Sequence, residues 1–83
     1  MSDIVLAYMD HTMLTGHLSL AERHITQGTR NVERQRQRVK ELRCDARDDC
    51  RSRSLLSQFE TLLALHIEDR DRVAAELVKS RNK

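Results

Sequence analysis

Proline is absent from the 83-residue sequence, glycine occurs only at Gly16 and Gly28, and aromatic residues make up 2% of the chain. Turn signals, and the aromatic residues that favour strands, are therefore scarce. Charged residues, at 34%, are abundant. This composition disfavours a sheet and is typical of amphipathic helices. A chain of this length forms one domain that buries only about 60% of its unfolded surface.

Long apolar runs are also missing, and none approaches the roughly 20 residues that a membrane-spanning helix needs. The opening Met-Ser-Asp lacks the basic start of a secretory signal, and Asp10 and His11 interrupt the apolar residues that follow. We therefore expect a cytoplasmic protein that does not contact a membrane. In that compartment Cys44 and Cys50 would be reduced thiols, with a disulfide between them as the alternative.

Apolar and small residues recur at steps of four and three along the first half of the chain. This spacing predicts a helix over about residues 16–44 with one narrow buried stripe. Ser19 and Glu22 match a capping box at its start, and Thr15 and Gly16 are alternative caps. We call the stripe the α-helical seam; its members are Leu14, Leu18, Ala21, Ile25, Gly28, Val32, Gln35, Val39 and Leu42.

The periodicity breaks at about residues 44–48, where we expect a turn, and resumes in a second helix over about 49–79. Its main apolar face comprises Leu55, Phe59, Leu62, Leu63, His66, Val73 and Leu77, widened by Leu56, Ile67, Ala74 and Val78. A short connection makes two helices antiparallel neighbours. We predict an all-α fold: an antiparallel two-helix hairpin over 14–83, preceded by residues 1–13 as a short helix or a mobile arm.

The second helix carries a wider apolar face than the narrow stripe of the first can cover. The N-terminal segment, a second copy of the chain or a different protein must cover the remainder, because an uncovered apolar band is usually an interaction site. Arg34 and Arg38 of the first helix would lie at the rim of this apolar band. We predict that a partner contacts Ile4, Leu6, Tyr8, Leu56, Leu63, Ile67, Ala74 and Val78.

Positive charge is concentrated in residues 17–43, which hold seven basic and three acidic groups. Glu33 and Glu41 interrupt the basic residues, which do not form one ribbon on a helical wheel, and no aromatic residue is placed among them for stacking on bases. This pattern favours a solvated helix surface whose arginine stems cover the seam. A nucleic-acid interface and an acidic protein partner are the alternatives.

A polar layer is expected inside the hairpin. A turn centred near residues 47–48 places His66 and Arg70 opposite Gly28, where a small residue leaves room for a bulky one. We predict that they form hydrogen bonds with each other and with Gln35 or His24, which would specify register. His24 and His66 alone are a weak metal or haem signature, so we expect no metal and no cofactor. No nucleophile–base arrangement or glycine-rich loop is present, so we expect no enzymatic activity.

Residues 17–77 resemble a group of small helical proteins of α-proteobacteria. The resemblance rests on "HLSLAERHITQG", "ERQRQRV" and "SLLSQFETLLALHIEDRDRV". The matching residues are His17, Leu18, Ala21, Glu22, His24, Ile25, Gly28, Arg34, Gln35, Leu55, Leu56, Phe59, Glu60, His66 and Arg70.

Among those proteins, the type with an assigned role is a quorum-sensing antiactivator of integrative and conjugative elements. The resemblance implies that this chain captures and inhibits a LuxR-type transcriptional activator, and a second transcriptional activator as well. Two other functions remain open from the residues alone. One is a small DNA-binding protein that uses the basic residues of the first helix, and the other is a structural homodimeric bundle. These classes are not fully exclusive, because a weak homodimer could open to bind a partner.

Overall fold

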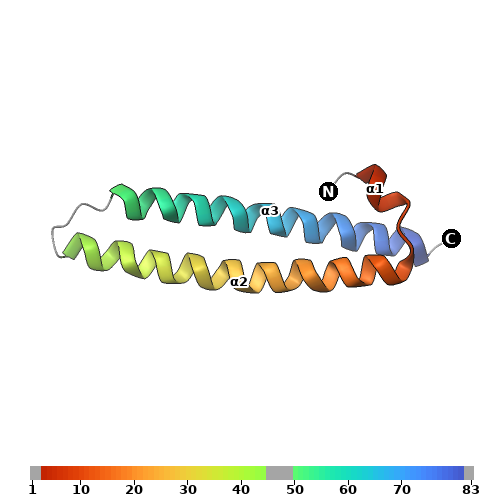
Figure 1. Cartoon of the computed structure of the whole chain (residues 1–83), viewed down its shortest axis with the longest axis horizontal. Helices are drawn as coiled ribbons and strands as arrows, with labels where there is room; N and C mark the ends of the chain where they lie inside the picture. The colour runs from red at the N-terminus through yellow and green to blue at the C-terminus, as the bar shows by residue number, and fades with distance from the viewer. Residues whose placement is uncertain (1–2, 45–49, 82–83) are drawn as a thin grey trace.

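The computed structural model describes residues 3–44 and 50–81, all but three of which lie in helices. Helix α1 spans Asp3–Ala7, α2 spans His11–Cys44 and α3 spans Cys50–Arg81. The two long helices run antiparallel as a hairpin, with α1 at the end opposite the connection (Figure 1). The predicted all-α hairpin is confirmed. The expected turn at about 44–48 lies almost entirely outside the described residues.

Helix α2 begins at His11, earlier than the start near residue 16 that the sequence predicted. Asp10 explains the difference, since its Oδ1 atom accepts a hydrogen bond of 2.8 Å from the backbone N–H of Met13. A side-chain acceptor at this position satisfies an N–H group that has no partner within the helix. Asp10 is therefore the cap, and Ser19 lies well inside the helix.

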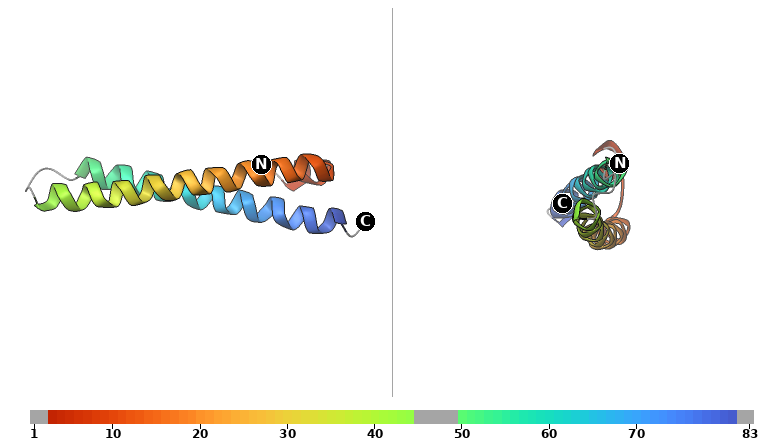
Figure 2. Two further views of the ribbon diagram at one scale, coloured as in Figure 1. Left: turned by 90° about the horizontal axis from the view of Figure 1, so that it is seen from below. Right: turned by 90° about the vertical axis from the view of Figure 1, so that its left-hand side faces the viewer.

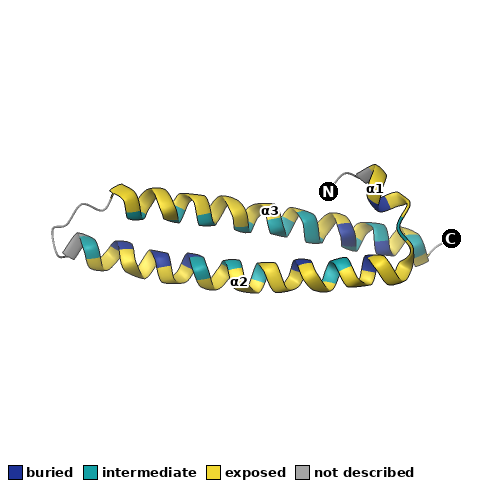
Figure 3. Ribbon diagram, viewed as in Figure 1, coloured by how far each residue is buried: buried dark blue, intermediate teal, exposed yellow. Residues whose placement is uncertain are grey.

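The predicted seam of α2 is confirmed. Five of its nine residues are buried, among them the polar Gln35, which is only 6% exposed, and the other four are half-buried. Figure 3 shows the buried and half-buried residues on the sides of α2 and α3 that face each other. The α2 side of the interface is thus a single stripe along the whole helix.

The fully buried side chains gather at the end of the hairpin where α1 lies. Leu6 is 1% exposed and Leu14 is 0% exposed, and both pack with Val73 and Leu77 of α3. Backbone hydrogen bonds from Tyr8 N–H to Val5 and from Met9 N–H to Leu6 turn the chain between α1 and α2. This turn directs Leu6 into the end of the hairpin, so α1 is anchored by one leucine.

The molecule is a rod of 59 × 18 × 14 Å, in which the long helices cross at a shallow angle (Figure 2). Its radius of gyration is 17.2 Å, compared with about 12 Å for a compact domain of this length. Its accessible surface is 6311 Å², compared with about 5,100 Å² for a compact monomer of the same mass. Two helices alone therefore leave roughly 1,200 Å² more surface in contact with water than is usual.

The two helices approach closely at Gly28, where a Cβ atom would lie 3.3 Å from Leu63 Cδ1. Leu63 is thus the residue opposite this glycine, whereas the sequence predicted His66 or Arg70 there. Leu63 lies three positions before His66 in α3. Packing leucine into the gap buries apolar surface, whereas a histidine or arginine there would lose its hydration. The predicted register was therefore wrong by about one helical turn.

Alanine substitutions at the two glycines test this close approach. Alanine stabilises a helix interior by up to about 1 kcal/mol relative to glycine, and nothing lies within 4 Å of a Cβ atom at Gly16. We expect Gly16→Ala to raise the free energy of unfolding by about 0.5–1 kcal/mol in urea denaturation followed by circular dichroism. Gly28→Ala should gain clearly less, because Leu63 must move. Equal gains would contradict the close approach.

Replacing Leu14 tests where the core lies. Leu14→Ala removes buried methyl groups and leaves a cavity, which should lower the free energy of unfolding by about 2–5 kcal/mol. The control is Leu65→Ala, at a position that is 52% exposed and where a change within about 0.5 kcal/mol is expected. Thermal unfolding of both variants is the measurement. A Leu14→Ala variant as stable as the control would show that the core is elsewhere.

Candidate interaction surface

The apolar face of α3 is only partly covered by α2. Val73 and Leu77 are the buried residues of this helix among those whose side chains are described. Leu55 and Leu62, which the sequence placed on the face toward the first helix, are 40% and 51% exposed. The expected surplus of apolar surface on the second helix is therefore present, and Leu55 and Leu62 are part of it, together with Leu65 and Val78.

These leucines line a groove that runs along one side of the hairpin, between α2 and α3. Four hollows make up the groove, and each shares at least one lining residue with the next. The largest, about 730 Å³, lies toward the connection, and the last one ends at Leu6 of α1. We call this feature the open groove; its α3 side consists of Arg51, Ser52, Leu55, Phe59, Leu62, His66, Asp69 and Val73.

The α2 side of the open groove changes in character along its length. Near α1 it presents Leu20, which is 40% exposed, and further along it presents Asn31. Toward the connection it presents Arg34 and Arg38. Both arginines, which the sequence placed at the rim of a partner site, therefore do border exposed apolar surface. Whether a partner contacts them stays a prediction.

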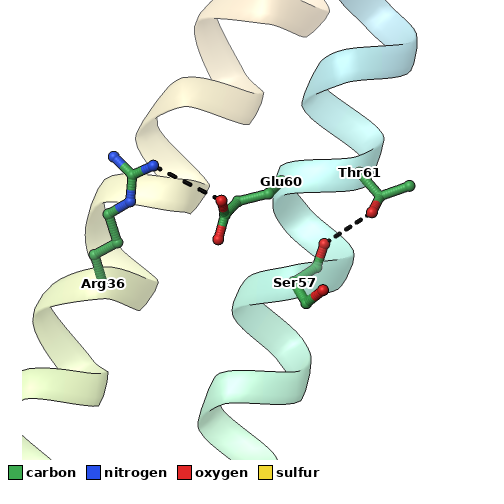
Figure 4. A network of polar contacts seen from close by, with 4 residues as sticks. All are labelled: Arg36, Ser57, Glu60 and Thr61. Carbon is green, nitrogen blue, oxygen red and sulfur yellow. Dashed lines mark hydrogen bonds and ion pairs between the residues drawn. The ribbon is translucent and has the colours of Figure 1, made fainter.

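The opposite side of the hairpin is bridged by charged side chains. Arg36 Nη2 lies 3.9 Å from Glu60 Oε2, and Figure 4 shows this pair reaching across from one long helix to the other. Residues two positions apart point to nearly opposite faces of a helix, so Arg36 and Glu60 face away from Arg34 and Leu62. The half-exposed pair contributes little stability. Its side chains nevertheless cover this side of the hairpin, so the side with the open groove is the less covered of the two.

The predicted partner-binding residues are distributed over several surfaces. Leu56, Leu63, Ile67 and Ala74 are half-buried, and Leu63 packs beneath Gly28. Leu6, which was predicted to contact a partner, is buried against α3 instead, because the turn after α1 directs it inward. The N-terminal segment therefore covers part of the apolar face of α3, which is one of the alternatives that the sequence left open. The exposed members are Ile4, Tyr8 and Val78, at 73%, 88% and 57%.

The predicted polar layer does not form as one network. His24 and His66 do meet, with ring centroids 4.9 Å apart. Gln35 instead donates a hydrogen bond of 2.9 Å to the carbonyl oxygen of Ser52, and the guanidinium of Arg70 is directed to Asp71, its neighbour in sequence. The shift in register explains this separation, since Leu63 lies opposite Gly28 where the sequence placed a polar residue.

Sequence reasoning missed the groove-lining role of Leu20, Leu55 and Leu62. Leu20 lies outside the predicted seam, and the sequence places Leu55 and Leu62 on the main apolar face of the second helix without showing that they border a groove. The available indication was the width of the apolar face on the second helix, because a narrow stripe covers only one edge of it. Which edge stays open depends on the register and supercoil of the pair, and these follow from packing.

Within residues 3–44 and 50–81, no group of three or more histidine, cysteine or acidic side chains is arranged to hold a metal ion. In the same part of the chain, no helix has the length and hydropathy to cross a bilayer. Cys50 is exposed at the start of α3. The side chain of Cys44 is not among the described ones. Whether Cys44 and Cys50 are reduced thiols or form a disulfide therefore stays a prediction.

Comparisons of the chain with known protein families, with curated proteins and with solved structures give no match. The functional interpretation therefore depends on the geometry of the open groove and on the residues that line it.

Proposed function

We propose that this chain is a protein-binding regulator that captures a transcriptional activator in the cytoplasm and inhibits it by stoichiometric, non-catalytic binding. The observation that carries the proposal is the open groove, in which the large apolar side chains of Leu55 and Leu62 contact water on a chain of only 83 residues. Contiguous exposed apolar surface of this kind typically marks a protein interface.

The finer part of the proposal comes from the resemblance of residues 17–77 to quorum-sensing antiactivators of conjugative elements. Its target would be a LuxR-type activator, and a second transcriptional activator would compete for the same surface. Several residues that carry the resemblance also line the open groove, namely Leu55, Phe59, His66, His24 and Arg34. Of these, Leu55, His24 and Arg34 are exposed and contribute little to the core, so their position in the groove supports its use for binding.

A protein partner matches the groove better than DNA does. DNA-binding surfaces place basic groups against phosphates and are strongly positive. Here Leu55 and Phe59 line the same hollow as Arg34 and Arg38, and so does the acidic Glu41. Interfaces between proteins combine an apolar centre with arginine at its edge.

Exchanging one leucine for aspartate tests the proposal. Leu62→Asp places a charge in the open groove and should weaken capture of the activator by about tenfold or more. Leu65→Asp is the matched control, because Leu65 is equally exposed (52% against 51%) but is not among the groove-lining residues. The measurements are co-purification of the LuxR-type activator and transcription from its target promoter in the native cell.

In these assays Leu65→Asp should capture the activator and repress transcription as the unaltered chain does, and both variants should keep helical circular dichroism spectra. Full capture and repression by a folded Leu62→Asp variant would reject the groove as the binding surface. Absence of any effect of the unaltered chain on the activator would reject the antiactivator function itself.

A further inference from the structure

We propose that the occupant of the open groove is an amphipathic α-helix of the partner protein, with acidic residues at the end that lies toward the connection between α2 and α3. This inference rests on the proposed function and specifies which kind of segment is bound. The supporting observations are the shape of the groove, the spacing of its leucines and the distribution of its charges.

The shape of the groove suits a helix. Two long antiparallel helices leave a concave seam on one side, and a third helix laid along that seam completes a three-helix arrangement. The chain already does this at one end, where α1 inserts Leu6 against Val73 and its Leu6 side chain closes the last hollow of the groove. Because α1 spans only Asp3–Ala7, it leaves the rest of the groove uncovered.

The apolar residues of the groove recur at helical spacing. Leu55, Phe59 and Leu62 follow one another at steps of four and three, so they form a ridge along α3 that faces the groove. A partner helix with apolar residues at the same steps would pack against this ridge. The stretch of α3 from Arg51 to His66 is about 23 Å long, so a partner helix of about 18 residues, about 27 Å long, would cover it.

The charges of the groove are unequal at its two ends. Toward the connection it is lined by Arg34, Arg38 and Arg51 against the single acidic residue Glu41. No ion pair to any of these three arginines is found in residues 3–44 and 50–81. Carboxylates of a partner would form charge-assisted hydrogen bonds with them. Glutamate is also favoured in the first turn of a helix, which orients the partner with its N-terminus there.

A second copy of the chain fits this charge distribution less well. If two grooves met in parallel, arginines would face arginines. If they met antiparallel, the three arginines would face the end lined by Asp69, which already lies 3.8 Å from Arg72 of its own helix. In both cases most of the positive charge stays unmatched, which makes a partner with its own acidic residues the better occupant.

Two synthetic peptides of 18 residues test the inference. Both carry leucine at steps of three and four on an alanine and glutamine background. One has three glutamates in its first two turns, and the other has three lysines at the same positions. Binding to the full chain is measured by fluorescence anisotropy. We expect the glutamate peptide to bind at least tenfold more tightly than the lysine peptide.

Charge reversal in the groove provides the second arm. Arg34→Glu combined with Arg38→Glu should reverse the preference, so that the lysine peptide binds more tightly. The matched control combines Arg23→Glu with Arg30→Glu, which changes the net charge equally at exposed positions that do not line the groove. This control variant should keep the preference for glutamate, although overall affinity falls slightly.

Several outcomes would overturn the inference. They are equal binding of the two peptides, no binding of either, the same reversal in the control variant, displacement of the glutamate peptide by duplex DNA, or a dimer in sedimentation that excludes the peptide. The peptide results can be distinguished from a failure of the proposed function, in which the unaltered chain would have no effect on the activator. Loss of activator capture by Leu62→Asp together with peptides that show no charge preference would retain the function and reject the acidic helix.

Discussion

The unequal width of two facing apolar surfaces determines most features of this molecule. The seam of α2 is a narrow stripe, whereas the apolar side chains of α3 extend over a broader arc. A helix can cover only the part of its neighbour that lies beneath its own side chains. Packing the seam against α3 therefore stabilises the hairpin and at the same time leaves Leu55 and Leu62 in contact with water.

The N-terminal segment reduces this imbalance at one end only. Leu6 completes a core with Leu14, Val73 and Leu77, and this is where the side chains are most fully buried. Towards the connection, Val32 and Val39 are buried on α2 while the described residues of α3 across from them are half-buried or exposed. Stability and binding surface are thus separated along the rod, so that a partner can occupy the groove without displacing the main core.

The sequence predicted the seam of α2 residue by residue, because a strict four–three spacing over a long helix has only one interpretation. It did not predict the start of α2, since Asp10 competes with several residues that have equal capping propensity. It also misplaced His66 and Arg70 in the polar layer. Register in an antiparallel hairpin depends on how the connection closes and on which side chain fills the gap at Gly28, and both are properties of the packed pair.

Solvent accessibility of leucine methyl groups tests the central claim most directly. At a concentration at which sedimentation detects only monomer, a neutral water-soluble nitroxide should broaden the methyl resonances of Leu55 and Leu62 about as strongly as those of Leu65. The methyl resonances of Leu14 and Leu77, which are 0% and 7% exposed, should be protected. Protection of Leu55 and Leu62 to the same degree as Leu14 would show that the groove is covered and would contradict the account.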